Sequence, residues 1–465
     1  MSQTNELLRK IPSVENVLNQ PEIKDVLKSA GIRVVTAAVQ NAIDKIRKSI
    51  FENEYNGGDD LLNNIVISVK EAVSRFNQPF YRKSVNATGI ILHTGLGRAV
   101  LPKAAIEQIQ KELSGYSVLQ LDIDSGKRSK RDIAVERLLS ELTGCEAAAV
   151  VNNNAAATAI VLNSVANNRE VIVSRGQLVE IGGSFRLPDV MKFSGAKMVE
   201  VGTTNKTHSK DYENAVTENT AAIMRVHPSN YKITGFSSEV ELQTLVEIAH
   251  RHNLVMIDDV GAGSLIDFAK YGFEPEPTLK ESIETGADII TSSGDKLIGA
   301  SQAGIILGKK AYIDALRKNQ FARIVRVDKM TLAVLEATLK LFFDEQKAFE
   351  QVPTLKMLRL NIAELSKRAE HLCVQIKKHI PNLEASTIDG FSQVGSGSLP
   401  QQNLKTKLVA LKSNAISCEN LALQLRQYQT PIFARIQHDM VLIDPRTLLD
   451  GDDTIIVEGL CSIQS

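Results

Sequence analysis

Cysteine is scarce in this chain of 465 residues. Its four cysteines, Cys145, Cys373, Cys418 and Cys461, form no C-x-x-C pair and stand at no metal-type spacing with histidine. This spacing argues against a disulfide framework and against a zinc site, and we expect no bound metal. The same pattern is typical of a protein kept in a reducing environment.

The sequence also lacks long apolar runs and an excess of charged residues of one sign. No apolar run approaches about 18 residues, the length that spans a bilayer, and residues 1–10 lack the apolar core of a signal peptide. The chain has 54 Lys and Arg against 54 Asp and Glu, so no overall positive charge points to nucleic acid. We therefore expect a cytoplasmic protein without a membrane partner.

The central part of the chain alternates strand-like apolar runs with amphipathic helical stretches. This alternation predicts an α/β fold with a doubly wound, mostly parallel sheet. Residues 238–252 have the helical spacing expected of a crossover element. The strand-like runs are residues 171–174, 198–201, 221–226, 254–257, 289–291 and 304–307.

Composition also indicates domain boundaries. From about Val334 to His379 the chain is charged and helical, and a short-strand region runs from Phe391 to near Ile456. Because one core normally stops growing well below this chain length, several domains are expected. We predict a large domain over residues 76–335 and a small C-terminal α+β domain over residues 336–465.

The first 75 residues form a third part, with helical periodicity and no strand-like run before Val85. Over residues 22–50 basic side chains outnumber acidic ones, a mild excess that suits a phosphate backbone. On charge alone, a solvated helix face is the favoured interpretation. The apolar face comprises Ile32, Val35, Val39, Ala42, Ile43, Ile46 and Ile50, and the basic residues are Lys24, Lys28, Arg33, Lys45, Arg47 and Lys48.

Lys296 is the strongest candidate for a chemical group. It lies in Ser293-Gly294-Asp295-Lys296, a polar turn entered from the apolar run Ala287-Asp288-Ile289-Ile290. A lysine at the carboxyl edge of an open α/β sheet sits where ligands bind, and partial burial favours its neutral amine. A neutral amine reacts with aldehydes, which predicts Schiff-base chemistry with pyridoxal phosphate (PLP). The competing interpretation is a solvated lysine just past a strand.

Two segments upstream supply the other parts of a PLP site. Asn153 and Asn154 follow an apolar strand and precede a strong helix former that begins with Ala155 and Ala156. An Asn-capped helix start with small residues suits a phosphate, although an ordinary capped helix reads the same way. Asp258 and Asp259 end a second apolar run, and one of them is expected to pair with the pyridinium nitrogen. The Asp-x-Gly-x-Gly spacing favours Asp259, because successive strand side chains face opposite ways.

Several long motifs resemble the bacterial selenocysteine synthase family, the L-seryl-tRNA(Sec) selenium transferases, from end to end of the chain. The N-terminal helical part distinguishes the chain from shorter selenium-transferase-like PLP proteins. The motifs are IPSV (11–14), VNATGIILHTGLGRA (85–99), VNNNAAA (151–157), SRGQLVEIGGSFR (174–186), SGDK (293–296) and RVDK (326–329).

The resemblance implies a PLP-dependent transferase of fold type I that converts seryl-tRNA(Sec) to selenocysteinyl-tRNA(Sec), through a dehydroalanyl intermediate that accepts selenium from selenophosphate. It implies that Lys296 holds the cofactor, that Asp295 is the catalytic acid, and that Arg98, Arg323 and Arg326 bind the anionic selenium donor. Guanidinium suits that donor because its planar fork binds phosphate-like oxygens in a bidentate way.

The resemblance further implies a homodecamer, a ring of five dimers with each site completed by two subunits. Arg98 lies far along the chain from Lys296, a placement that suits donation across a subunit contact, unless Arg98 folds back onto its own site. Two other functions stay open: a PLP enzyme acting on a free amino acid or amino sugar, and a tRNA-binding protein whose PLP site is idle.

Overall fold

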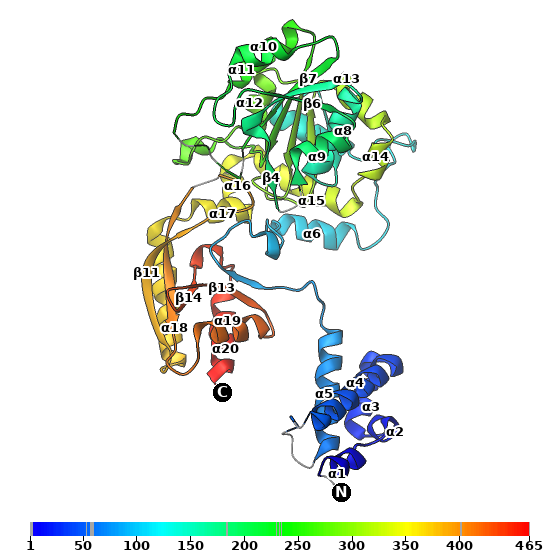
Figure 1. Cartoon of the computed structure of the whole chain (residues 1–465), viewed down its shortest axis with the longest axis vertical. Helices are drawn as coiled ribbons and strands as arrows, with labels where there is room; N and C mark the ends of the chain where they lie inside the picture. Colours follow the sequence, from blue (N-terminus) through cyan, green and yellow to red (C-terminus); the bar gives the residue numbers. More distant parts are fainter. Residues whose placement is uncertain are drawn as a thin grey trace. The chain divides into compact units, whose positions relative to one another are not determined.

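A computed structural model describes residues 3–52, 54–55, 60–182, 185–228, 230–231, 233, 235–399 and 402–464 (Figure 1). The chain divides into two compact units, Met1–Lys83 and Ser84–Ser465. No described helix combines the length and apolar character needed to cross a bilayer.

The first unit is helical, as its periodicity predicts. Ser13 and Asp60 cap two of its helices, each accepting a hydrogen bond from a backbone N–H three residues on. Most of the predicted apolar face is buried, but Ile32, the first residue of its helix, is exposed. The helices are α1 (Gln3–Lys10), α2 (Val14–Leu18), α3 (Pro21–Ala30), α4 (Ile32–Phe51) and α5 (Leu61–Asn77).

The second unit contains a seven-stranded sheet in the order β2-β10-β9-β8-β7-β3-β6. All neighbouring pairs are parallel except those of β10, which runs antiparallel to both β2 and β9. Each predicted strand-like run lies in or overlaps one of these strands. The strands are β2 (Ala147–Val151), β3 (Glu170–Ser174), β6 (Lys197–Val201), β7 (Thr220–Val226), β8 (Val255–Gly261), β9 (Ile289–Ser293) and β10 (Gly304–Gly308).

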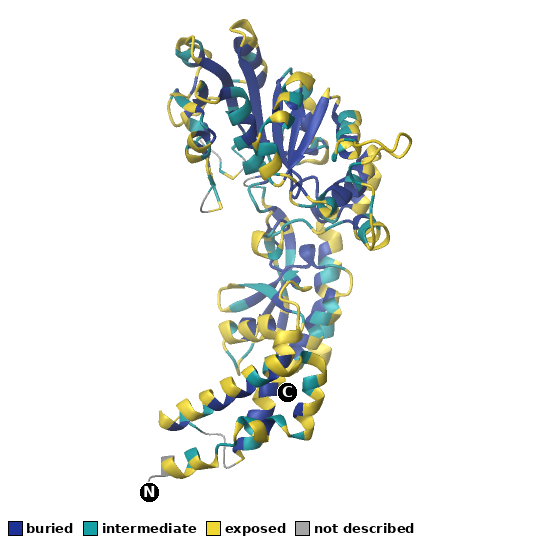
Figure 2. Cartoon of the chain, turned by 90° about the vertical axis from the view of Figure 1, so that its right-hand side faces the viewer, coloured by how far each residue is buried: buried dark blue, intermediate teal, exposed yellow. Residues whose placement is uncertain are grey.

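Apolar side chains bury both faces of this sheet, so its strands other than the edge strand β6 are almost wholly buried (Figure 2). One face packs against α8 (Asn154–Ala166), α9 (Leu187–Phe193) and α13 (Lys310–Lys318). The other packs against α7 (Ile133–Thr143), the crossover helix α11 (Leu242–Arg251), α12 (Leu279–Glu284) and α15 (Lys329–Leu339). Strands covered on both faces read as continuous apolar runs, which explains why the sequence shows them clearly.

A second sheet, in the order β1-β13-β14-β12-β11, brings together distant parts of the unit. β1 (Val85–Ala87) pairs in parallel with β13 (Ile432–Gln437), next to β14 (Met440–Ile443). β11 (Glu384–Ser392) pairs with β12 (Leu404–Lys412). The strand region therefore begins at Glu384, before the expected Phe391, and ends with β14 at Ile443, because Ile456 lies in the helix α20 (Asp452–Gln464).

The remaining helices of the second unit are short, apart from α18. The helical stretch expected over residues 334–379 is divided after Leu339, where α15 ends, at Pro353, which starts α17, and at Asn361, which caps α18. These helices are α6 (Lys103–Glu112), α10 (Ser209–Ala215), α14 (Phe321–Ile324), α16 (Glu345–Gln351), α17 (Pro353–Arg359), α18 (Ile362–His379), α19 (Cys418–Gln427) and α20 (Asp452–Gln464), and a two-stranded ribbon joins β4 (Glu180–Ile181) and β5 (Phe185–Arg186).

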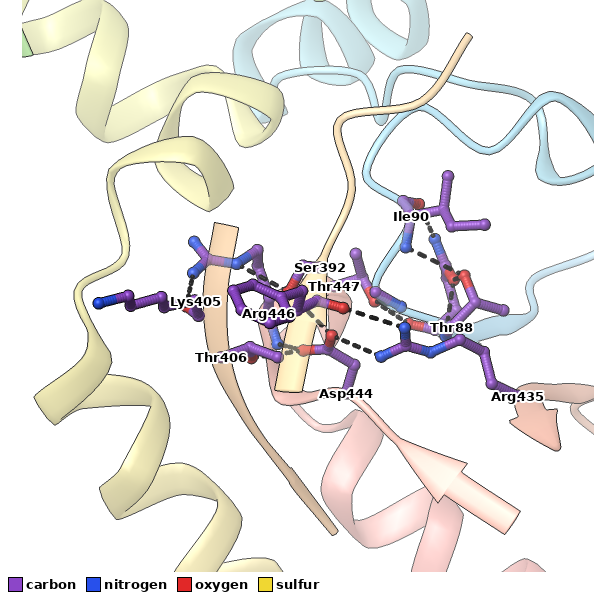
Figure 3. Close-up of polar contacts among 12 residues, drawn as sticks. Thr88, Ile90, Ser392, Lys405, Thr406, Arg435, Asp444, Arg446 and Thr447 are labelled. Carbon is purple, nitrogen blue, oxygen red and sulfur yellow. Dashed lines mark hydrogen bonds and ion pairs between the residues drawn. The ribbon is translucent and has the colours of Figure 1, made fainter. Parts of the chain in front are cut away.

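A buried polar network fixes the chain after β1 to the second sheet (Figure 3). The fully buried Asp444 carboxylate accepts hydrogen bonds from Ser392, Thr406 and Arg435. The Asp444 amide donates to the carbonyl of Ala87, and Thr447 Oγ1 accepts from the amide of Gly89. The segment that leads to Arg98 is thus held by residues more than 300 positions away.

Candidate active site

Lys296 follows β9 in a turn that is closed by its own backbone. The Gly294 amide donates to the Ala303 carbonyl at 2.9 Å, and the Gly299 amide donates to the Lys296 carbonyl at 3.0 Å. Only 6% of Lys296 is exposed. Within the described ranges its amine has neither a hydrogen-bond nor an ion-pair partner. The lysine is therefore held in the interior with its amine unoccupied.

Burial lowers the pKa of Lys296, and the positive charge of Arg98 lowers it further. The negative charges of Asp295, Asp259 and Glu276 oppose that shift. Because the net pKa shift is downward, the lysine reaches its neutral, nucleophilic form at a lower pH than a solvated lysine does.

Arg98 reaches Lys296's neighbour within the same chain. Its Nη1 donates to Asp295 Oδ2 at 2.8 Å, and only 8% of the Asp295 side chain is exposed. Arg98 has a φ of 62°, in the left-handed region, at the end of a tight turn in which its amide donates to the His93 carbonyl. Of the two placements considered for Arg98, the structure has the one that folds back onto its own site.

The two adjacent aspartates have different partners. Asp258 is fully buried and forms a two-point ion pair with Arg225, at 2.7 and 3.0 Å, besides accepting from Ser282. Asp259 instead accepts from Asn154 Nδ2 at 2.9 Å and from Thr158 Oγ1 at 3.1 Å, both on α8. Asp259 and the α8 N-terminus therefore belong to one cluster, and Asp258 belongs to another.

Asp259 has neutral hydrogen-bond donors but no cation paired with it among the described residues. Burial raises its pKa, against the hydrogen bonds from Asn154 and Thr158, which lower it. A buried carboxylate is costly unless a cation is paired with it. A protonated ring nitrogen of PLP would supply the missing charge, so this position fits the cofactor.

The N-terminus of α8 begins beside this carboxylate. Asn153 caps the helix, and its side chain accepts from the Ala156 amide at 2.9 Å. Asn154 bridges the helix to Asp259, and its buried Oδ1 has no partner in the described structure. The small side chains of Ala155 and Ala156 leave the first turn open to an anion. Ser293, which is 6% exposed, ends β9 on the same sheet edge.

Arg323 and Arg326 make their contacts away from Lys296 and Arg98. Both line a cavity of about 390 Å³ with other basic side chains, Lys130, Arg131, Arg317 and Lys318. The residue pair Arg326 and Val151 forms a β-bridge. Within the described chain neither arginine forms a hydrogen bond or ion pair with Lys296, Asp295 or Arg98. The structure thus brings Arg98 to the lysine but does not join Arg323 and Arg326 to it.

His227 and Glu276 were not singled out in the sequence. His227 follows β7, its amide donates to the Asp259 carbonyl at 2.9 Å, and its Nε2 lies 3.0 Å from Glu276 Oε2. A lone histidine after a strand carries no signal by itself, and Glu276 lies 49 residues further on. The position of His227 at the carboxyl end of a strand is the signal that points to it. No described group of three or more His, Cys, Asp or Glu residues has the arrangement of a metal site.

Comparison with known proteins identifies the family. A family model described as L-seryl-tRNA selenium transferase matches residues 84–449, and one described as selenocysteine synthase N terminal matches residues 8–47. The chain belongs to the L-seryl-tRNA selenium transferase family.

Members of this family match almost the whole chain. A Clostridium botulinum (strain Loch Maree / Type A3) protein named L-seryl-tRNA(Sec) selenium transferase is 44% identical over 455 residues, 97% of this chain and 98% of the relative. A protein of that name from Alkaliphilus oremlandii (strain OhILAs) is 45% identical over 452 residues, 97% of each chain. The resemblance inferred from the motifs is confirmed.

A solved structure, of D-glucosaminate-6-phosphate ammonia-lyase, has a TM-score of 0.56 and 21% identity, and the match covers 83% of this chain and 98% of that one. This likeness concerns the fold. The predicted fold class is confirmed: PLP-dependent transferase fold type I, with a helical N-terminal region.

Proposed function

We propose that this chain converts L-seryl-tRNA(Sec) to L-selenocysteinyl-tRNA(Sec), with selenophosphate as the selenium donor. The serine hydroxyl is lost and selenium adds to the resulting dehydroalanyl group. The observation that carries this proposal is the family match over both units, because it includes the N-terminal region as well as the unit that contains Lys296.

The chain's own residues would hold PLP as follows. Lys296 binds it covalently through its neutral amine, and Asp259 pairs with the ring nitrogen. The α8 N-terminus receives the phosphate through the backbone of Asn153, Asn154, Ala155 and Ala156, with Ser293 beside it. When bound, PLP withdraws electrons from the serine α-carbon, which makes the α-proton removable.

Lys296 and its neighbours supply the groups that remove the substrate α-proton and bind the selenium donor. The Lys296 amine, when not bound to the cofactor, would take the α-proton, and its lowered pKa favours the neutral form that accepts a proton. Asp295 acts beside the lysine as a catalytic residue, and its ion pair holds Arg98 at the site. Arg98 offers a guanidinium to the oxygens of the anionic donor.

Arg323 and Arg326 are proposed as further donor-binding catalytic residues, in a homodecamer built as a pentamer of dimers. In such an oligomer, the corresponding two arginines of a partner subunit would lie near Lys296 and bind the donor together with Arg98. Exposed apolar side chains between α6 and α7 support a subunit contact, because large apolar groups favour burial. They are Tyr116, Val118, Leu121 and Ile123.

We assign tRNA binding to the helical module of residues 1–75 and catalysis to the large domain of residues 76–335. Residues 336–465 are assigned to a small α+β domain. Lys28, Arg47 and Lys48 form exposed ion pairs within the module. Lys24, Arg33 and Lys45 have no ion-pair partner in the described part, so they are among the cations available for phosphates. A reaction on charged tRNA belongs in the cytoplasm.

The test uses the full chain with PLP, seryl-tRNA(Sec) and selenophosphate. Wild type should form selenocysteinyl-tRNA(Sec), and borohydride should fix PLP to the peptide that contains Lys296. Lys296→Ala should lose both, whereas Lys280→Ala, at an exposed lysine on α12, should retain both. Turnover of free serine without tRNA would favour a small-molecule enzyme, and tRNA binding without PLP would favour an idle site.

A further inference from the structure

A histidine–carboxylate pair lies just after β7, the strand next to that of Asp259. In the parallel register of β7 and β8, Val226 lies opposite Asp259, and His227 is the next residue. Its amide is bonded to Asp259, and its Nε2 lies 3.0 Å from Glu276. The Glu276 side chain is 6% exposed and the His227 side chain 23% exposed, so the carboxylate is interior and the imidazole is reachable.

Glu276 is close enough to Lys296 for its charge to act on the lysine amine. His227 follows β7 and Lys296 follows β9, which run parallel in one sheet, so the histidine and the lysine lie at the same sheet edge. With Nε2 occupied by Glu276, the other imidazole nitrogen, Nδ1, has no partner in the described structure. Glu276 fixes the ring so that Nδ1 is the nitrogen left for a ligand.

The other acidic groups at this edge are already engaged. Asp258 is paired with Arg225, and Asp259 is bonded to Asn154 and Thr158. Asp295 is paired with Arg98 at 2.8 Å. A carboxyl group donates a proton only in its neutral form, and in that form Asp295 would lose this ion pair. His227, in contrast to these carboxylates, can carry a donatable proton without breaking a contact, because its cation would strengthen the pair with Glu276.

Loss of the serine hydroxyl needs such a proton. As the α-proton passes to Lys296, the electrons of the Cα–H bond form the Cα=Cβ double bond. The Cβ–O bond breaks and its electron pair stays on oxygen. Hydroxide leaves poorly, whereas transfer of a proton to the oxygen lets water leave.

We propose that His227 is the catalytic residue that donates this proton, through Nδ1, and that Glu276 is its positioning residue. This inference rests on the proposed function, since it assigns the proton to the serine oxygen. It transfers to His227 the acid role that the family resemblance suggests for Asp295.

The experiment compares two leaving groups on the full-length, PLP-loaded enzyme. Seryl-tRNA(Sec) loses hydroxide and needs a proton, whereas β-chloroalanyl-tRNA(Sec) loses chloride and needs none. His227→Gln should slow conversion of the seryl substrate about 100-fold, the usual contribution of a general acid, and the chloro substrate by less than about tenfold. Glu276→Gln should show the same preference for the chloro substrate, at a smaller amplitude.

Two readouts do not depend on turnover. Borohydride should fix PLP to Lys296 in His227→Gln as in wild type, and exchange of the substrate α-proton with deuterated solvent should persist. The matched control is His250→Gln, since His250 pairs with the buried Asp288 at 3.1 Å near the opposite end of β9. That variant should show no preference between the leaving groups.

Equal slowing of both substrates by His227→Gln, or loss of the trapped PLP, would overturn the proposal in favour of a purely structural or cofactor-binding role. A leaving-group preference in Asp295→Asn but not in His227→Gln would return the acid role to Asp295. Failure of the wild-type enzyme to convert seryl-tRNA(Sec) would instead count against the proposed function, so the two failures are distinguishable.

Discussion

Replacing Gly89 by alanine should release the segment that carries Arg98. Gly89 has a φ of 73°, and an added Cβ would lie 2.0 Å from Asp444 Oδ2 and 2.5 Å from Asp444 Cγ. Asp444 is fully buried and cannot move without breaking hydrogen bonds from Ser392, Thr406 or Arg435. The substitution therefore combines backbone strain with disruption of a buried charged network.

Gly144 supplies the matched control, because its φ is 78° and nothing lies within 4 Å of its added Cβ. Left-handed backbone costs about 1–2 kcal/mol for a residue with a Cβ, and this term is common to both variants. Losing a hydrogen bond to a charged group costs a further 1.5–3 kcal/mol, roughly, and only Gly89→Ala incurs it. We therefore expect Gly89→Ala to weaken its surroundings by about 1.5–3 kcal/mol more than Gly144→Ala weakens its own.

Peptide-resolved hydrogen exchange on the full chain measures this difference. The Asp444 amide, bonded to the Ala87 carbonyl at 2.9 Å, reports opening of the network. A difference of about 1.5–3 kcal/mol corresponds to exchange roughly 10- to 150-fold faster at peptides over residues 84–92 and 440–447. Exchange there that is no faster in Gly89→Ala than in Gly144→Ala would refute the reasoning that Asp444 leaves no room for a side chain at residue 89.

Three other predictions follow from the site and the N-terminal module. The rate at which Lys296 forms its borohydride-trappable link to PLP should rise with pH through the lowered pKa of the lysine. Arg98→Gln removes a charge that lowers this pKa and should move the profile to higher pH, whereas Asp295→Asn removes a charge that raises it and should move the profile to lower pH. Shifts of both variants in the same direction would contradict the assignment. Asp259→Asn should slow α-proton exchange and leave the fold intact. Asp258→Asn should chiefly destabilise the fold, by about 3–5 kcal/mol, because it leaves the Arg225 charge unpaired. Thermal unfolding and α-proton exchange are measured on both variants, and a fold destabilised more by Asp259→Asn would contradict the assignment. Removing residues 1–75 should abolish binding of seryl-tRNA(Sec) but leave PLP bound, and full-chain binding should weaken as salt rises; tight binding by the truncated chain in a filter assay would reassign the module.

The sequence by itself determined the elements with local signals. Strands covered on both faces appear as apolar runs, and the Asn153 cap marks the start of α8, since a cap depends on a few neighbouring residues. The turn Ser293-Gly294-Asp295-Lys296 identified the candidate lysine in the same local way. The long motifs identified the family, because their order along the chain needs no knowledge of contacts.

Only the tertiary structure decided which distant groups meet. Strand alternation separates Asp258 from Asp259 but does not say that Arg225 pairs with one and α8 with the other. The Arg98–Asp295 contact joins residues 197 positions apart. His227 and Glu276 meet because β7 ends beside β8 and a loop returns over that edge. Such pairs depend on sheet order and crossover paths, which short-range periodicity does not encode.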